Sequence, residues 1–98
     1  MSYMFCNCHK FNSNLSYWNV SNVTNMKYMF NNCSLFNGEG IENWDVSSVD
    51  DFSYMFYYCY VFNVDLNKWV VKKQAVTYFT FYQNHKLKEK PKWYYKWY

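Results

Sequence analysis

A ten-residue pattern occurs three times in the first part of the chain, and it constrains the fold more than any other feature. The pattern is tyrosine, methionine, phenylalanine, two variable residues, cysteine, two variable residues, phenylalanine and asparagine. Its copies span residues 3–12, 28–37 and 54–63, so they begin 25 and then 26 residues apart. A fixed period in the twenties is typical of chains that stack one small unit on the next. The repeat predicts one domain built from units at 3–27, 28–53 and 54–78.

Each unit continues with a second pattern, an aliphatic residue, two variable residues, tryptophan, one variable residue and valine. Its copies span residues 15–20, 41–46 and 66–71. This is the spacing of the strand segment in leucine-rich repeats, with tryptophan at the central apolar position. Apolar and polar residues alternate at its end, so Trp18 and Val20 should point inward while Tyr17 and Asn19 point outward. We therefore predict a short parallel strand in each unit.

The first pattern has a different period. Apolar residues recur there at spacings of three and four, as in Val23, Met26, Met29, Phe30 and Cys33. That spacing suits one or two turns of α-helix or 3₁₀-helix on the far side of each coil. The predicted fold class is therefore a repeat solenoid resembling a leucine-rich repeat, with a short parallel strand and a short helical segment in every coil.

The end of the chain departs from the repeat. Residues 79–81 stand where the tyrosine, methionine and phenylalanine belong, Asn84 takes the cysteine position and Leu87 the phenylalanine position. We expect a partial fourth unit from residue 79, so that the solenoid spans 1–85 and a basic, aromatic tail spans 86–98. Residues 66–98 hold eight lysines and one acidic residue, whereas residues 1–65 hold two lysines and six acidic residues. The excess of positive charge therefore belongs to the end of the chain.

The repeat resembles that of the BspA-like leucine-rich repeat surface proteins. The likeness lies in residues 36–63, where Trp44, Val46 and Val49 precede the third copy of the ten-residue pattern, and again in residues 18–26. It covers residues 3–71. The resemblance implies a right-handed solenoid used for attachment or protein binding, commonly at a microbial cell surface. No signal peptide is visible at the start of the sequence.

Few residues suggest reaction chemistry. The sequence has no Ser-His-Asp set, no glycine-rich phosphate loop and no repeated pair of carboxylates, so we expect a protein that is not an enzyme and needs no cofactor. The cluster at residues 6–9 offers two cysteines and a histidine but lacks the further ligands of a zinc site. Cys8, Cys33 and Cys59 are expected to be small buried hydrophobic residues. Asn12, Asn37 and Asn63 are expected to satisfy backbone groups of their loops and of the next coil.

The predicted function is a non-enzymatic binding or adhesion module whose strand face contacts a protein or other macromolecule. The candidate contacts are the outward positions of the strands and their neighbours: Tyr17, Asn19, Asn43, Asp45, Ser47, Lys68, Val70 and Lys72. Two alternatives remain. The lysine-rich tail could bind a polyanion such as nucleic acid or an anionic membrane surface, or the chain could be a truncated repeat fragment without independent function. End-to-end self-association is a further expectation, and no apolar stretch is long enough to span a membrane.

Overall fold

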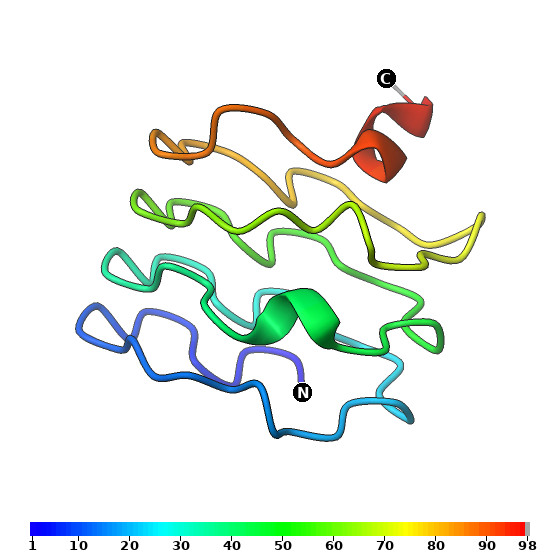
Figure 1. The fold of residues 1–98 in the computed structure, drawn as a ribbon, viewed down its shortest axis with the longest axis horizontal. Helices are drawn as coiled ribbons and strands as arrows, with labels where there is room; N and C mark the ends of the chain where they lie inside the picture. Colours follow the sequence, from blue (N-terminus) through cyan, green and yellow to red (C-terminus); the bar gives the residue numbers. More distant parts are fainter. Residues whose placement is uncertain (98) are drawn as a thin grey trace.

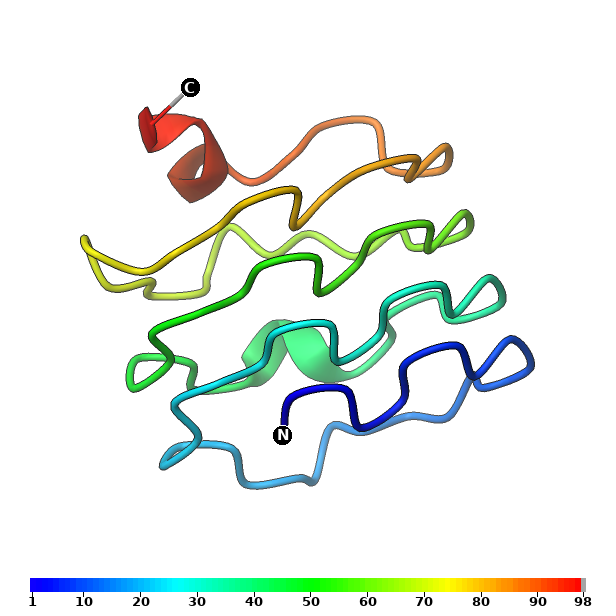
Figure 2. The ribbon, with the colours of Figure 1, turned by 180° about the vertical axis from the view of Figure 1, so that it is seen from behind.

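Successive repeats lie one above the other in the computed structural model, which describes residues 1–97. Every coil passes along one broad side of the molecule and returns along the other. Figure 1 shows the returning segments in front, and Figure 2 shows the opposite side. We call residues 1–8, 26–33, 52–59 and 77–84 the ladder segments, and residues 11–20, 36–46, 62–71 and 87–94 the return segments. The molecule measures 32 × 28 × 20 Å along its principal axes.

The predicted fold class is wrong. Residues 1–97 contain no α-helix and no β-strand; they are mostly turns and irregular coil. The regular elements are two 3₁₀-helices, η1 (Ile41–Asn43) and η2 (Lys92–Trp97). Two isolated parallel bridges join Asp51 to Asn25 and to Val76. The chain is therefore not a solenoid that repeats a strand and a helix.

The type of structure found on each side of the coil also differs from the prediction. Backbone bonds between coils concentrate in the ladder segments, which were expected to be helical. There the N–H groups of Tyr3, Phe5 and Asn7 donate to the carbonyls of residues 27, 29 and 31, at 2.8–3.0 Å. In contrast, η1 falls inside a return segment, where a strand was expected.

The physical reason lies in a repeated pair of left-handed residues. Tyr28 and Asn32 have φ values of 61°, and the equivalent residues of the other three ladder segments also have positive φ. Each stands third in a tight turn, such as the turn closed by the bond from the Met29 N–H to the Met26 carbonyl. A left-handed residue breaks a right-handed helix. The apolar spacing of three thus comes from consecutive turns.

The core consists of the residues that both patterns placed inside. Phe30, Phe36, Phe56 and Phe62 have no solvent exposure. Phenylalanine rings of adjacent coils stack into a column, with centroids 5.5 Å apart between Phe5 and Phe30 and 5.8 Å apart between Phe30 and Phe56. The predicted inward direction of the tryptophan and valine positions is confirmed in the second unit, where Trp44 is 5% and Val46 1% exposed.

The repeated tryptophan also links the coils. The Trp44 indole N–H donates to the Leu15 carbonyl at 3.0 Å, and the Trp69 indole N–H donates to the Ile41 carbonyl at 2.9 Å. The Trp93 indole makes the same bond to the Leu66 carbonyl at 2.9 Å. Trp93 therefore takes the tryptophan position of the fourth coil, although the sequence placed it in the basic tail.

Of two smaller predictions about the repeat, the one for the asparagines is confirmed for Asn12 and Asn37 but not for Asn63, and the one for Asn84 is confirmed. Asn12 Oδ1 accepts from the backbone N–H of Asn37 in the next coil, and Asn37 Oδ1 accepts from the Glu39 N–H of its own loop. In the fourth unit, Asn84 stands at the cysteine position, and its side chain donates to the carbonyls of Phe56 and Cys59 at 2.8 and 3.0 Å.

Candidate protein-binding face

A column of aromatic rings runs along the outside of the ladder segments. Tyr3, Tyr28, Tyr54 and Phe79 occupy the same place in the four coils. Neighbouring tyrosine rings of this column are 4.8 Å apart and nearly parallel, and Phe79 continues it at 5.5 Å. Each of these residues has a left-handed φ and directs its side chain outward, whereas the side chain two residues later points toward the core. The inner rings thus use their faces on one another and present their edges to solvent.

The third and fourth coils widen this column into a patch. Where the second coil has Asn31 and Asn32, the third has Tyr57 and Tyr58, and the fourth has Tyr82 at the first of these positions. We call the following side chains the tyrosine patch: Tyr54, Tyr57, Tyr58, Tyr60, Tyr78, Phe79 and Tyr82. Tyr78 is 63% and Phe79 51% exposed, while Tyr60 and Tyr82 are each more than a third exposed.

Contacts within the patch hold the rings in place. Tyr57 stacks on Tyr82 with centroids 5.0 Å apart, and it meets Tyr58 edge to face at 4.4 Å. A side-chain hydrogen bond with Tyr58 raises the pKa of Tyr57 above its ordinary value. The Tyr57 hydroxyl therefore remains neutral at physiological pH. Tyr60 stacks on His85 at 5.5 Å, which extends the ring contacts to the adjoining loop.

The eight sequence-predicted contact residues lie on the opposite side, along the return segments and the turns that follow them. All eight are exposed. Tyr17 and Val70, at 81% and 74%, are the most exposed large hydrophobic side chains. Asn43 lies at the end of η1. These residues are spread over separate coils, and none of them belongs to the tyrosine patch.

Several of the predicted residues are engaged in local contacts. Asn19 Oδ1 accepts from the N–H and hydroxyl of Ser21, and Asp45 Oδ1 accepts from the same two groups of Ser47. These bonds to Ser47 lower the pKa of Asp45. The Lys72 ammonium lies 2.6 Å from Asp50, in an ion pair that is open to solvent.

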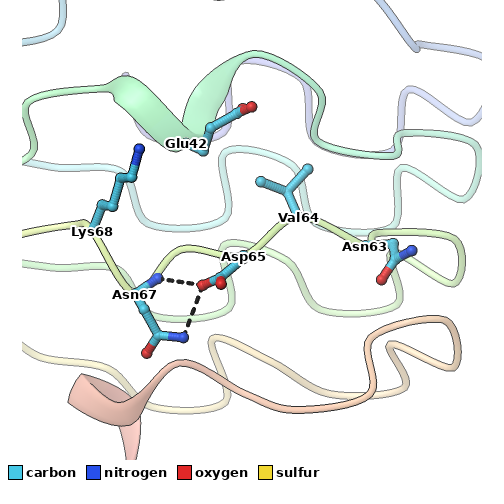
Figure 3. A pocket seen from close by; sticks show the side chains of 6 residues that line it. All are labelled: Glu42, Asn63, Val64, Asp65, Asn67 and Lys68. Carbon is cyan, nitrogen blue, oxygen red and sulfur yellow. Dashed lines mark hydrogen bonds between the residues drawn. The ribbon is translucent and has the colours of Figure 1, made fainter.

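Lys68 contributes to a polar groove between the second and third coils (Figure 3). The groove has a volume of about 500 Å³ and is lined by Glu42, Asn63, Val64, Asp65, Asn67 and Lys68. Two of its carboxylates have partners within the chain: Asp65 Oδ1 accepts two bonds from Asn67 at 2.8 Å, and Glu42 accepts from the Gly40 N–H. The side chains of Lys68 and Asn63 are exposed.

The cysteines serve the contacts between coils. The thiols of Cys33 and Cys59 donate to the carbonyls of Phe5 and Phe30, at 2.8 and 2.9 Å. Burial raises the pKa of Cys33 to about 12 and also raises that of Cys59. Both thiols therefore stay protonated and are poor nucleophiles. The prediction of burial holds for these two cysteines but is wrong for Cys8, which is exposed.

The structure gives little support for a metal site or for a membrane-spanning helix. Among residues 1–97, no three histidine, cysteine or acidic side chains are grouped so that they could hold a metal ion. Nor does any helix in that part of the chain combine the length and hydropathy needed to cross a bilayer.

The repeat geometry covers the chain up to Tyr94, and one family model matches the same extent, residues 1–94. The chain belongs to the family described as "Mycoplasma protein of unknown function, DUF285". No curated protein and no solved structure matches it. The DUF285 match includes residues 86–94, in agreement with the role of Trp93 in the fourth coil. The family description names neither repeats nor adhesion, so the resemblance to BspA-like proteins remains a prediction.

Sequence reasoning missed the tyrosine patch of this DUF285 chain because it assigned the ladder segments to a helical far side. A signal was nevertheless present. Tyrosines 57, 58 and 60 fill variable positions of the third pattern, where the second pattern has the polar residues Asn31, Asn32 and Ser34. Variable positions are the ones that the core does not restrict, so a run of aromatic residues there indicates an exposed aromatic surface.

Proposed function

We propose that the chain is a non-enzymatic protein-binding module and that the tyrosine patch contacts the partner. The observation that carries the proposal is the gathering of seven aromatic side chains on one side of two adjacent coils. Tyrosine provides a large amphipathic contact area and loses little conformational entropy on binding, and it is enriched at the centres of protein interfaces. A contiguous exposed aromatic surface of this kind usually marks an interaction site.

The packing of the rings favours a protein over a nucleic acid or sugar. Bases and sugars bind aromatic side chains through the flat faces of the rings. In the column, however, the faces of Tyr28 and Tyr54 are occupied by neighbouring rings. The Lys-aromatic alternation near the end of the chain is also partly used internally, because Trp93 stacks on Trp69 at 6.1 Å and Tyr94 is buried. The polyanion alternative therefore has less support.

A binding role also agrees with the state of the cysteines, which are the only strong nucleophiles of the sequence. Cys33 and Cys59 are protonated, buried and hydrogen-bonded to the preceding coil. Their geometry supports a structural role.

The test is a selection of a random peptide library on the immobilised chain, followed by rebinding to variants. The double variant Tyr57→Ser, Tyr82→Ser should weaken the selected peptides at least about tenfold, since each change removes a large contact area from the patch. The control is Tyr17→Ser, which removes a more exposed tyrosine from the opposite side. Circular dichroism of every variant establishes that it is folded.

The reverse pattern would contradict the proposal. If Tyr17→Ser or Val70→Ser abolished binding and the patch variant did not, the contact surface would be the return side that the sequence predicted. Recovery of lysine-dependent binders that are lost between 50 and 200 mM salt would instead favour the polyanion alternative.

A further inference from the structure

The backbone hydrogen bonds between ladder segments all run in the same direction along the stack. In the first three coils, alternate N–H groups all donate to the following coil. Tyr28, Phe30 and Asn32, for example, donate to the carbonyls of residues 53, 55 and 57 at 2.9, 3.0 and 2.6 Å. Tyr54, Phe56 and Tyr58 donate in the same way to residues 78, 80 and 82. Every coil thus presents a row of N–H groups toward the C-terminal end of the stack.

The fourth coil has the same row of N–H groups. Its equivalent residues are Phe79, Phe81 and Gln83, and Phe79 and Gln83 have the positive φ of their counterparts, at 50° and 61°. Within the described part of the chain, the N–H groups of these three residues have no hydrogen-bond partner.

A hollow of about 270 Å³ lies at this edge. It is lined by Tyr78, Phe79, Phe81, Tyr82, Lys90 and Tyr94. Three of these side chains belong to the tyrosine patch, and Lys90 is the one charged residue among them. Exposed Lys86, Lys88 and Lys92 stand nearby in the sequence, and Glu89 is the only acidic residue after Asp65. The hollow therefore combines aromatic walls with an ammonium group, and two of its lining residues, Phe79 and Phe81, have backbone N–H groups without a partner among residues 1–97.

We propose that this hollow binds a carboxylate side chain from an acidic segment of the protein partner. The inference rests on the proposed function and specifies its partner: the tyrosine patch provides the apolar contact area, and Lys90 with the free N–H row receives the charge. Charge-assisted bonds to an ammonium and to backbone N–H groups are stronger than neutral ones. They fix the orientation of the bound segment on the patch.

A second copy of the chain is a weaker candidate for the same place. Its first coil would offer the matching carbonyls of Ser2, Met4 and Cys6, the counterparts of those that accept bonds in the second coil. However, the first unit carries Lys10 and Lys27 and no acidic residue. Stacking it on the lysine-rich fourth coil would bring like charges together, whereas an acidic segment complements them.

The experiment is a nuclear magnetic resonance titration of the whole ¹⁵N-labelled chain with a short peptide of alternating glutamate and glycine. The amide signals of Phe79, Phe81 and Gln83 should shift, and those of the equivalent residues Tyr28 and Asn32 should not. Lys90→Gln should weaken binding by about threefold to tenfold, because one charge-assisted contact is lost. The matched control Lys86→Gln removes the same charge outside the hollow and should change the affinity by less than about twofold.

Each of the other outcomes overturns the proposal. Equal losses in Lys90→Gln and Lys86→Gln, or tighter binding of a single-stranded oligonucleotide, would mean general attraction of polyanions. Shifts of the same amides that grow with protein concentration alone, with association seen by sedimentation, would identify a second copy as the occupant. If the glutamate peptide does not bind but patch-dependent library peptides do, the carboxylate site is wrong while the proposed function stands.

Discussion

At the level of single residues, the repeated cysteine acts as a hydrogen-bond donor to the coil before it. Cys33 and Cys59 donate to phenylalanine carbonyls 28 and 29 residues earlier, and in the fourth coil the amide of Asn84 donates to the Phe56 carbonyl 28 residues earlier. Because either a thiol or an amide can occupy this position, the position requires a hydrogen-bond donor of moderate size and not a reactive group.

Cys59→Ala should lower the free energy of unfolding by about 1–3 kcal/mol, because the Phe30 carbonyl would lose the buried thiol donor and keep only the bond from the Cys33 N–H. Cys59→Ser keeps a donor and should lose less, and Cys8→Ala, at an exposed site, should change the value by less than about 0.5 kcal/mol. Urea unfolding followed by tryptophan fluorescence measures all three. Equal losses in the serine and alanine variants would show that volume, and not hydrogen bonding, governs the site.

Asp45 and Asp65 give the chain a sensitivity to acid. Bonds from Ser47 and from Asn67 lower the pKa of these carboxyl groups in the folded state. A lowered folded pKa means that their contribution to stability is complete above the unfolded value of about 3.9 and is lost as the pH falls through the folded pKa. Urea unfolding should therefore show a loss of stability below about pH 4, and this loss should be smaller in the double variant Asp45→Asn, Asp65→Asn. An unchanged pH profile would rule out these two turns as its source.

At the level of elements, η2 completes the fourth coil. Trp93 stacks on Trp69, with centroids 6.1 Å apart, and donates to the Leu66 carbonyl, while the backbone N–H of Lys92 donates to Asn67 Oδ1. Trp93→Ala should lower the free energy of unfolding by about 2 kcal/mol or more, since it removes a large, partly buried ring and a bond between coils. Lys92→Ala, with an exposed side chain, is the matched control. If thermal melts showed equal losses of stability in the two variants, the segment would act through its charge.

The sequence predicts which positions are equivalent in successive coils, but it does not predict the local backbone conformation. The inward direction of Trp44 and Val46 and the equivalence of Asn84 to a cysteine follow from spacing, because stacking copies in equivalent positions requires only a constant period. The local conformation does not follow. Apolar residues at spacings of three and four fit a helix and fit consecutive turns equally well, and nothing in the residues Tyr28 and Asn32 reveals their left-handed φ.

The candidate site was missed for the same reason. Outward exposure of all eight predicted residues is correct, but whether they contact a partner depends on which side of the coil is free of local bonds. Asp45 and Lys72 proved to have partners within the chain. Only the assembled structure brings Tyr57 and Tyr82 into contact, across 25 residues of sequence.

At the level of the whole molecule, the coils share one core but are not equally protected. Phe5, Phe11 and Trp18 of the first coil are only half-buried, whereas Phe30 and Phe36 of the second are fully buried. Units of a stacked repeat gain stability from both neighbours, so the first coil of this chain should open more readily than the third. Brief digestion with trypsin should therefore cleave after Lys10 before it cleaves after Lys68, although both side chains are exposed. Mass spectrometry of the early fragments measures the order, and earlier cleavage at Lys68 would contradict it.

The one-way row of N–H groups has a consequence for how such a chain can vary in length. Because every coil receives the same bonds from the coil before it, a duplicate of residues 28–53 inserted after residue 53 would meet matching groups on both sides. The tyrosine column would gain one ring, and both ends would keep their present surfaces. Half a unit would place a return segment against a ladder segment, so the N–H row would not meet matching carbonyls. Chains with this repeat can therefore gain or lose whole units that share one orientation. The last coil would be unchanged, and the hollow beside Lys90 would move outward with it.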